Sequence, residues 1–170
     1  MTLLQVTVAS PEEGLVARAR GADGVHVPAS GKTPETVRAI VAAAQGPLPV
    51  SAGARPDLSA ATALHDSGAG LVEIAVGRGD ADRIRAMAPL ARSVRVVGAI
   101  AIDDFDPALV RALADGGFAG VMLDAGQGAR LFDRTDIGVL AGFADAARAS
   151  GLSLGLSGGL GAPDIPGLRV

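Results

Sequence analysis

The sequence has no cysteine, tryptophan or tyrosine, only two histidines and only one lysine. Without cysteine there is no disulfide, no thiol nucleophile and no cysteine-bound zinc, and two imidazoles are too few for a histidine-rich metal site. Metal chemistry would need carboxylates alone, and we expect neither a metal nor a cofactor. Any side-chain amine chemistry has a single candidate, Lys32 in the segment PASGKTPET.

The chain also lacks a basic excess and long apolar runs. Its net charge is −3 and its only aromatic residues are four phenylalanines, so little is available to stack bases or hold a phosphate backbone, and we expect no nucleic-acid partner. No apolar run approaches the ~18 residues of a spanning helix. The start, MTLLQVTVASPEEG, lacks the basic flank and long apolar stretch of a signal peptide. We therefore expect a cytoplasmic protein with no membrane partner.

Apolar runs rich in Val, Ile and Leu alternate with stretches of helical period along the whole chain, which is typical of repeated βα units. A chain of 170 residues with 49% hydrophobic residues can bury the core of one domain. The helices are expected to bury apolar stripes that include Val41 and Ile137. We predict seven strands, each too apolar to have a wet face: residues 3–9, 24–27, 48–52, 70–76, 93–101, 120–124 and 152–156.

A parallel sheet with helices outside it is either doubly wound or closed into a barrel. The first predicted strand leads into Ala9-Ser10-Pro11-Glu12, not into the Gly-x-Gly-x-x-Gly of a dinucleotide fold. A glycine-rich turn, LSGGLGAP at 156–163, instead follows the last strand, where barrel enzymes bind phosphate. We predict a TIM-type (β/α) barrel, a single domain over residues 1–170.

Seven strands leave this barrel short of its eighth βα unit, so either the barrel is open or an end, such as the C-terminus, is missing. An open barrel has two unpaired strand edges, and such edges invite pairing with another chain. The sequence therefore predicts a homo-oligomer.

In a parallel barrel the chemistry lies at the C-terminal ends of the strands. Asp124 ends the strand GVMLD, where its carboxylate can act as a general acid or base or can merely cap the next loop. His26 also ends a strand, but a lone histidine there is more often a packed, hydrogen-bonded residue than a catalyst. His65, on a helix, is expected at the surface. Lys32 follows the second strand, where its amine can reach the barrel mouth or simply be solvated.

The glycine-rich turn is the candidate anion site. Ser157, Gly158 and Gly159 offer consecutive backbone N–H groups to a phosphate or carboxylate, although such turns are often only tight connections. Arg130 and Asp133 in the segment GARLFD can clamp a phosphate and orient the loop, or can form an ordinary surface ion pair.

Three pieces of the chain, LLQVTVASPEEG, VMLDAGQGARLFD and LGLSGGLGAPDIP, together resemble the (5-formylfuran-3-yl)methyl phosphate synthase family, also called 4-(hydroxymethyl)-2-furancarboxaldehyde-phosphate synthases. The resemblance runs almost end to end. It implies a TIM-type barrel lyase that condenses two molecules of glyceraldehyde 3-phosphate into a furan aldehyde phosphate, an early step toward methanofuran-type cofactors. It also implies a lysine Schiff base, with nearby carboxylates moving protons while phosphate leaves.

Carried over residue by residue, the resemblance places the family's strand-six aspartate on Asp124 and its phosphate turn on residues 157–159. The family's Asp-Val-Lys-Asn-Pro after strand two reads His26-Val27-Pro28-Ala29 here, and its strand-four lysine falls on Glu73. The lysine expected shortly after Asp124 is absent from residues 125–129.

Two hypotheses follow. The first is a lyase that acts on a phosphorylated aldehyde, with Lys32 as a relocated amine and Asp124 as acid or base. The second is a non-catalytic barrel relative that keeps the phosphate turn and binds a phosphorylated metabolite or supports a partner subunit. The position of the Lys32 amine relative to Asp124 and Ser157 would discriminate between them.

Overall fold

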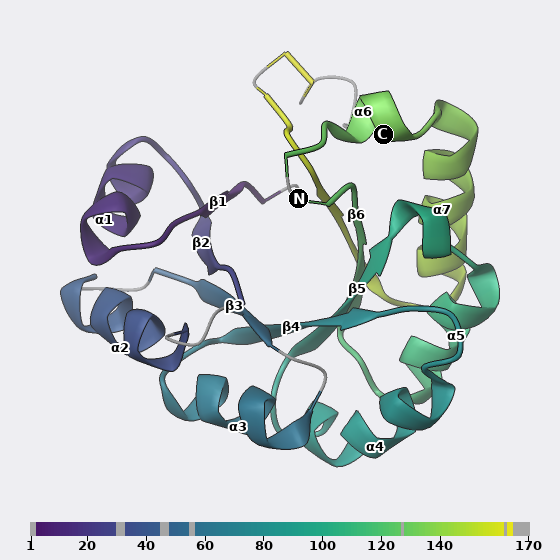
Figure 1. Ribbon diagram of the computed structural model, residues 1–170, viewed down its shortest axis with the longest axis horizontal. Helices are drawn as coiled ribbons and strands as arrows, with labels where there is room; N and C mark the ends of the chain where they lie inside the picture. Colours follow the sequence, from purple (N-terminus) through teal and green to yellow (C-terminus); the bar gives the residue numbers. More distant parts are fainter. Residues whose placement is uncertain are drawn as a thin grey trace. The chain divides into compact units, whose positions relative to one another are not determined.

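The computed structural model describes residues 3–29, 33–44, 48–54, 57–126, 128–161 and 163–164. The chain divides into two compact units, Met1–Ala75 with Pro89–Val96 and Val76–Ala88 with Val97–Val170. Each unit consists of parallel strands connected by helices (Figure 1). Among the described residues, no helix has the length and apolar character needed to cross a bilayer.

The first unit contains four parallel strands in chain order: β1 (Gln5–Thr7), β2 (Gly24–Val27), β3 (Val50–Ala54) and β4 (Leu71–Val76). Its helices lie on one side of these strands: α1 (Pro11–Ala19), α2 (Thr33–Ala43) and α3 (Leu58–Asp66) (Figure 1). In the register, His26 is the partner of Thr7 on β1 and of Ser51 on β3. Polar side chains from neighbouring strands are thereby aligned.

Apolar packing and side-chain caps fix the helices of this unit. Helix α2 buries Val37 and Ile40 almost completely, as its helical period predicts. Val41 was expected on the same stripe, but it is 41% exposed because it lies at the margin of the buried face. Ser10 caps α1 by accepting the N–H of Glu13.

The second unit contains three parallel strands in chain order: β5 (Val96–Ala101), β6 (Gly120–Asp124) and β7 (Ser153–Ser157). Helix α4 (Ala81–Ala91) precedes β5, and the helical segments between the strands are η1 (Ile102–Asp104), α5 (Pro107–Asp115), α6 (Leu131–Arg134) and α7 (Ile137–Ala149).

The core of this unit includes Phe143 of α7, whose ring meets that of Phe105 edge-on at 5.6 Å between centroids. Asp106 caps α5 by accepting the N–H of Ala108, and Pro107 follows at the first helical position. Ile137, expected on the buried stripe of α7, is 75% exposed because it is the first residue of the helix.

Strand order decides between the two architectures that the sequence left open. Doubly wound sheets reverse their strand order at a switch point, whereas the order in each unit here follows the chain without reversal. Sequential parallel βα units are the connectivity of a (β/α) barrel. The predicted fold class is therefore confirmed, with seven strands among the described residues. The extent of a single domain and the homo-oligomer stay predictions.

Two strands contradict the expectation that no strand has a wet face. All three residues of β1 are exposed, and Leu154 of β7 is 48% exposed. Among the described residues, β1 pairs only with β2 and β7 only with β6. An apolar sequence makes burial favourable, but a strand at an edge has fewer neighbours to bury it.

Candidate functional site

The loops after β6 and β7 bring several of the predicted site residues together. Asp124 and Ser157 are register partners at the ends of the two strands. The Ala125 N–H donates to the Ser157 carbonyl at 3.0 Å, and the Leu131 N–H donates to the Gly158 carbonyl at 2.9 Å. We call residues 124–130 and 157–159 the loop cluster, apart from residue 127, which the structure does not describe.

The turn in the loop cluster admits only glycine. Gly158 has φ +125°, and a Cβ there would lie 2.4 Å from the Cβ of Ala125. Gly159 has φ +48°, and its Cβ would lie 2.9 Å from Cγ of Arg130. The N–H groups of both glycines donate to no residue that the structure describes. Two adjacent amides without partners are suited to an anion.

Asp124 shows the loop-capping contact that its position allowed. Its Oδ1 accepts the Gly126 N–H at 3.2 Å, and the residue is half-buried. Oδ2 makes no hydrogen bond to any residue in the described part of the chain. One carboxylate oxygen thus holds the loop while the other is available for an outside proton or hydroxyl.

The carboxylate beside the Arg130 guanidinium belongs to Asp164 and not to Asp133, which the sequence had suggested. Arg130 Nη2 lies 3.5 Å from both carboxylate oxygens of Asp164, whereas Asp133 contacts Arg130 only through the backbone. Asp164 is itself held by the Gly161 N–H at 2.8 Å. The Arg130 side chain is 58% exposed. A contact this long and exposed leaves the guanidinium free to turn toward an anion.

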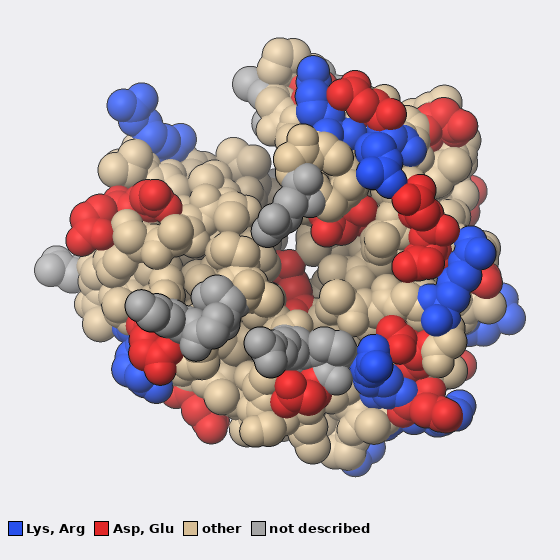
Figure 2. Space-filling model, viewed as in Figure 1, with Lys and Arg blue, Asp and Glu red and all other residues tan. Residues whose placement is uncertain are grey.

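Other arginines of this unit are also paired, and positive and negative side chains intermingle on the face seen in Figure 2. The pairs among described residues are Arg83–Asp80, Arg85–Asp82, Arg134–Asp103 and Arg148–Asp145. Lys32, the predicted amine, lies outside the described residues.

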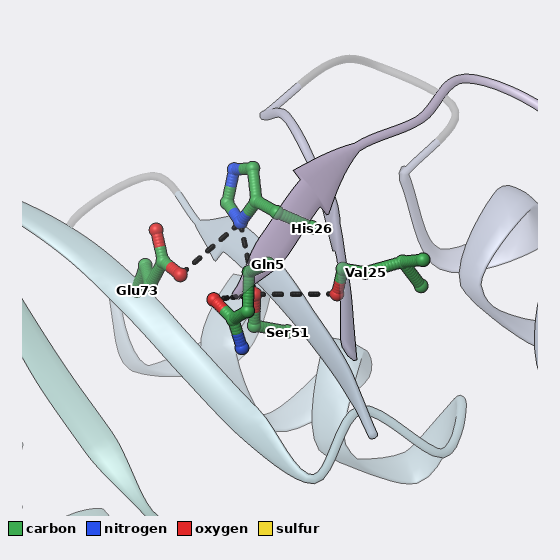
Figure 3. A network of polar contacts seen from close by, with 5 residues as sticks. All are labelled: Gln5, Val25, His26, Ser51 and Glu73. Carbon is green, nitrogen blue, oxygen red and sulfur yellow. Dashed lines mark hydrogen bonds and ion pairs between the residues drawn. The ribbon is translucent and has the colours of Figure 1, made fainter. Parts of the chain in front are cut away.

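A second polar group, on the strands of the first unit, was not among the predicted site residues. We call it the strand cluster (Figure 3), and its members are Gln5, His26, Ser51 and Glu73. His26 Nδ1 lies 3.0 Å from Ser51 Oγ and 3.1 Å from Glu73 Oε1. Ser51 Oγ lies 3.4 Å from Gln5 Oε1 and 3.5 Å from the Val25 carbonyl.

Two members of the strand cluster are buried, and Gln5 is exposed. Ser51 is fully buried and Glu73 is 8% exposed, whereas the His26 side chain is 20% exposed. Glu73 is the one acidic or basic residue in the buried set of the described chain. A buried carboxylate is costly unless it is paired and hydrogen-bonded, and His26 supplies that pairing.

One sequence signal could have identified this cluster. Glu73 interrupts the otherwise apolar strand LVEIAV, and a charge inside a buried strand requires a partner. His26 and Glu73 are also two positions at which the chain differs from the family it resembles. The structure shows that these two replacements contact each other. Ser51 and Glu73 lie within β3 and β4, not after them.

Sequential parallel βα units, with polar groups on the strands and an open glycine turn after the last of them, define this chain as a (β/α)-barrel protein. The sequence profile of 4-HFC-P synthases matches residues 4–170. The chain belongs to the 4-HFC-P synthase family, which confirms the resemblance seen in the sequence. A search of curated protein sequences found no match.

Solved structures share the fold at low sequence identity. The 3-hexulose-6-phosphate synthase of Salmonella typhimurium superposes with a TM-score of 0.77 at 20% identity, over 98% of this chain and 83% of that one. The HpcH/HpaI aldolase of Desulfitobacterium hafniense gives 0.75 at 14% identity, over 98% and 82%. The 3-keto-L-gulonate-6-phosphate decarboxylase of Vibrio cholerae gives 0.73 at 14% identity, over 96% and 81%. These similarities establish the fold class alone.

Proposed function

We propose that the chain is a lyase of the 4-HFC-P synthase type that acts on glyceraldehyde 3-phosphate and releases phosphate and water as the furan ring forms. The observation that carries this proposal is the loop cluster. It places two glycine amides that donate to no described residue directly after Ser157, the register partner of Asp124, at the end of β7. Family membership over residues 4–170 supports the same substrate class.

In this proposal each part of the loop cluster has a separate task. The amides of Gly158 and Gly159 hold the substrate phosphate, and Arg130 turns from Asp164 to neutralise it. The free oxygen of Asp124 exchanges a proton with the substrate. Because the exposed arginine is flexible, the amides fix the position of the phosphate and Arg130 contributes mainly charge.

The chemistry that the family implies needs an amine, and Lys32 is the only lysine. Its Nζ attacks the aldehyde carbon, water leaves, and the resulting imine makes the neighbouring C–H bond acidic. The chain α-amino group is the only other amine, and every variant keeps it, so an adduct on Lys32 is the one that substitution of Lys32 removes.

The test is intact-mass analysis after incubation with glyceraldehyde 3-phosphate and borohydride, which reduces an imine to a stable adduct. Wild type and the variants Lys32→Ala and Lys32→Arg are compared, since arginine keeps the charge but forms no such imine. We expect an adduct in wild type that both variants lose, together with phosphate release followed by ³¹P NMR. Phosphate binding without release or a lysine adduct would contradict the lyase and favour the non-catalytic phosphate-binding relative.

A further inference from the structure

The strand cluster contains more polar machinery than its strands need in order to pair. The buried neighbours of Glu73 on β4 are Val72 and Ile74, and an apolar residue at position 73 would pack without burying a charge. Glu73 instead contacts the imidazole of His26 at 3.1 Å. A buried polar pair that two apolar residues could replace without loss of stability needs a reason other than folding.

The partners of Nδ1 indicate which nitrogen of His26 carries the proton. Ser51 can donate its hydroxyl proton to Gln5 Oε1 or to the Val25 carbonyl, since both are acceptors. An ionised Glu73 carboxylate can only accept. Beside that carboxylate we assign the ring proton to Nδ1, which then donates to Glu73 and to Ser51 Oγ. The neutral ring then carries its lone pair on Nε2.

Nε2 is directed away from this network. Figure 3 shows both dashed contacts of the ring at one nitrogen and the other nitrogen pointing away from Glu73 and Ser51. Nε2 contacts no partner among the described residues, and the side chain is partly exposed. A serine nucleophile needs a ring nitrogen with a free lone pair at its hydroxyl. With the proton on Nδ1, the nitrogen at Ser51 has none, so this arrangement does not activate Ser51.

The geometry points to His26 as a proton-transfer residue that acts through Nε2, with Glu73 as its positioning residue. In the step that we infer, the Nε2 lone pair takes the proton from the carbon next to the substrate carbonyl or imine. The C–H electron pair forms a carbon–carbon double bond, and the C=O or C=N π pair moves to oxygen or nitrogen. The imidazolium stands beside the Glu73 carboxylate, which stabilises its charge, and Nε2 later returns the proton. This inference rests on the proposed function for the identity of the substrate.

The chain offers a matched control, because its only other histidine, His65, is exposed on α3. Glyceraldehyde 3-phosphate is incubated in D₂O with wild type, His26→Asn and His65→Asn, against a buffer blank. Deuterium uptake next to the carbonyl and phosphate release are measured together. We expect His26→Asn to slow both by about 100-fold or more and His65→Asn to leave both within about twofold.

The outcomes separate this inference from the proposed function. If wild type releases phosphate and His26→Asn does so at the same rate, the inference fails and the proposed function stands. If wild type neither exchanges deuterium nor releases phosphate, the proposed function fails and the inference fails with it.

A spectroscopic measurement tests the geometry without altering the cluster. In ¹⁵N NMR of the histidine rings, assigned with the His65→Asn variant, the neutral His26 ring should carry its proton on Nδ1. A proton on Nε2 would overturn the inference. Glu73→Gln should change the share of His26 rings that carry the proton on Nδ1, and should lower kcat by about tenfold or more with KM within about twofold. Glu35 is an exposed glutamate, so Glu35→Gln should change neither the tautomer nor kcat.

Discussion

In the loop cluster the groups that can hold an anion are backbone amides of glycines and an arginine side chain that is 58% exposed, and the Asp124 carboxylate belongs to the same cluster. In the strand cluster the polar groups are side chains, of which Ser51 and Glu73 are buried. Backbone amides cannot titrate, so the loop cluster offers a fixed partial positive charge to an anion. A histidine held by a buried carboxylate can bind and release a proton. The glycine amides are therefore suited to anion binding and the His26–Glu73 pair to proton transfer.

The two clusters also differ in how they affect the stability of the folded protein. The loop cluster depends on backbone geometry that only glycine adopts without strain. The strand cluster depends on burying a charge, whose penalty is offset only while its partner is present. Backbone changes should therefore be most damaging in the loop cluster, and the loss of a single partner should be most damaging in the strand cluster.

The largest effect should come from Gly158→Ala. The added Cβ would lie 2.4 Å from the Cβ of Ala125 at a φ of +125°, so overpacking and backbone strain together should lower the free energy of unfolding by about 2–4 kcal/mol. Urea denaturation measures this loss of unfolding free energy. Gly142→Ala is the control, because its Cβ meets nothing within 4 Å on helix α7 and should stabilise slightly. Equal effects of the two changes would contradict the role of the turn.

The second largest effect should come from a substitution in the strand cluster. Glu73→Leu leaves the Nδ1 donor of His26 without its acidic partner and should cost about 1–3 kcal/mol of unfolding free energy. The double variant His26→Leu with Glu73→Leu should recover most of that loss, since replacing a buried polar pair by apolar residues is often neutral or stabilising. Thermal and urea unfolding of wild type, the two single variants and the double variant test this cycle. Strictly additive losses from the two single changes would mean that His26 and Glu73 have no coupling energy and would contradict the pair.

Arg130→Ala should separate binding from folding. The Arg130–Asp164 contact is long and exposed, so the free energy of unfolding should change by less than about 0.5 kcal/mol. Affinity for inorganic phosphate, measured by calorimetry, should fall about tenfold because a charged donor is lost. Arg148→Ala, which breaks the exposed pair with Asp145, should leave phosphate affinity unchanged.

The smallest effect has the opposite sign. Asp164→Asn keeps an oxygen for the Gly161 N–H but removes the charge that competes for Arg130. Phosphate affinity should rise by about twofold to threefold, with stability within about 0.5 kcal/mol. Calorimetric titration with inorganic phosphate measures this change in affinity. A fall in affinity would show that Asp164 positions Arg130 productively.

The sequence by itself determined what local patterns encode. Alternating apolar and helical periods gave the βα repeats, and Asp106-Pro107 marked the start of a helix. The barrel-type fold and the meeting of Asp124 with Ser157 followed, because consecutive parallel strands place their C-terminal ends at one edge. The sequence did not predict that β1, Leu154 and Ile137 are exposed. Hydrophobic residues favour burial, but the sequence pattern does not say which neighbouring elements cover them.

Only the tertiary structure decided the strand cluster. His26 and Ser51 are 25 residues apart, and Ser51 and Gln5 are 46 apart, so no local motif joins them. They meet because strand register aligns them, and register is a non-local property set by the packing of the whole sheet. The sequence showed a lone histidine and a stray glutamate. The fold brings them into contact as a pair. Nε2 of His26, which contacts no described residue, is the atom through which we propose that the pair transfers a proton.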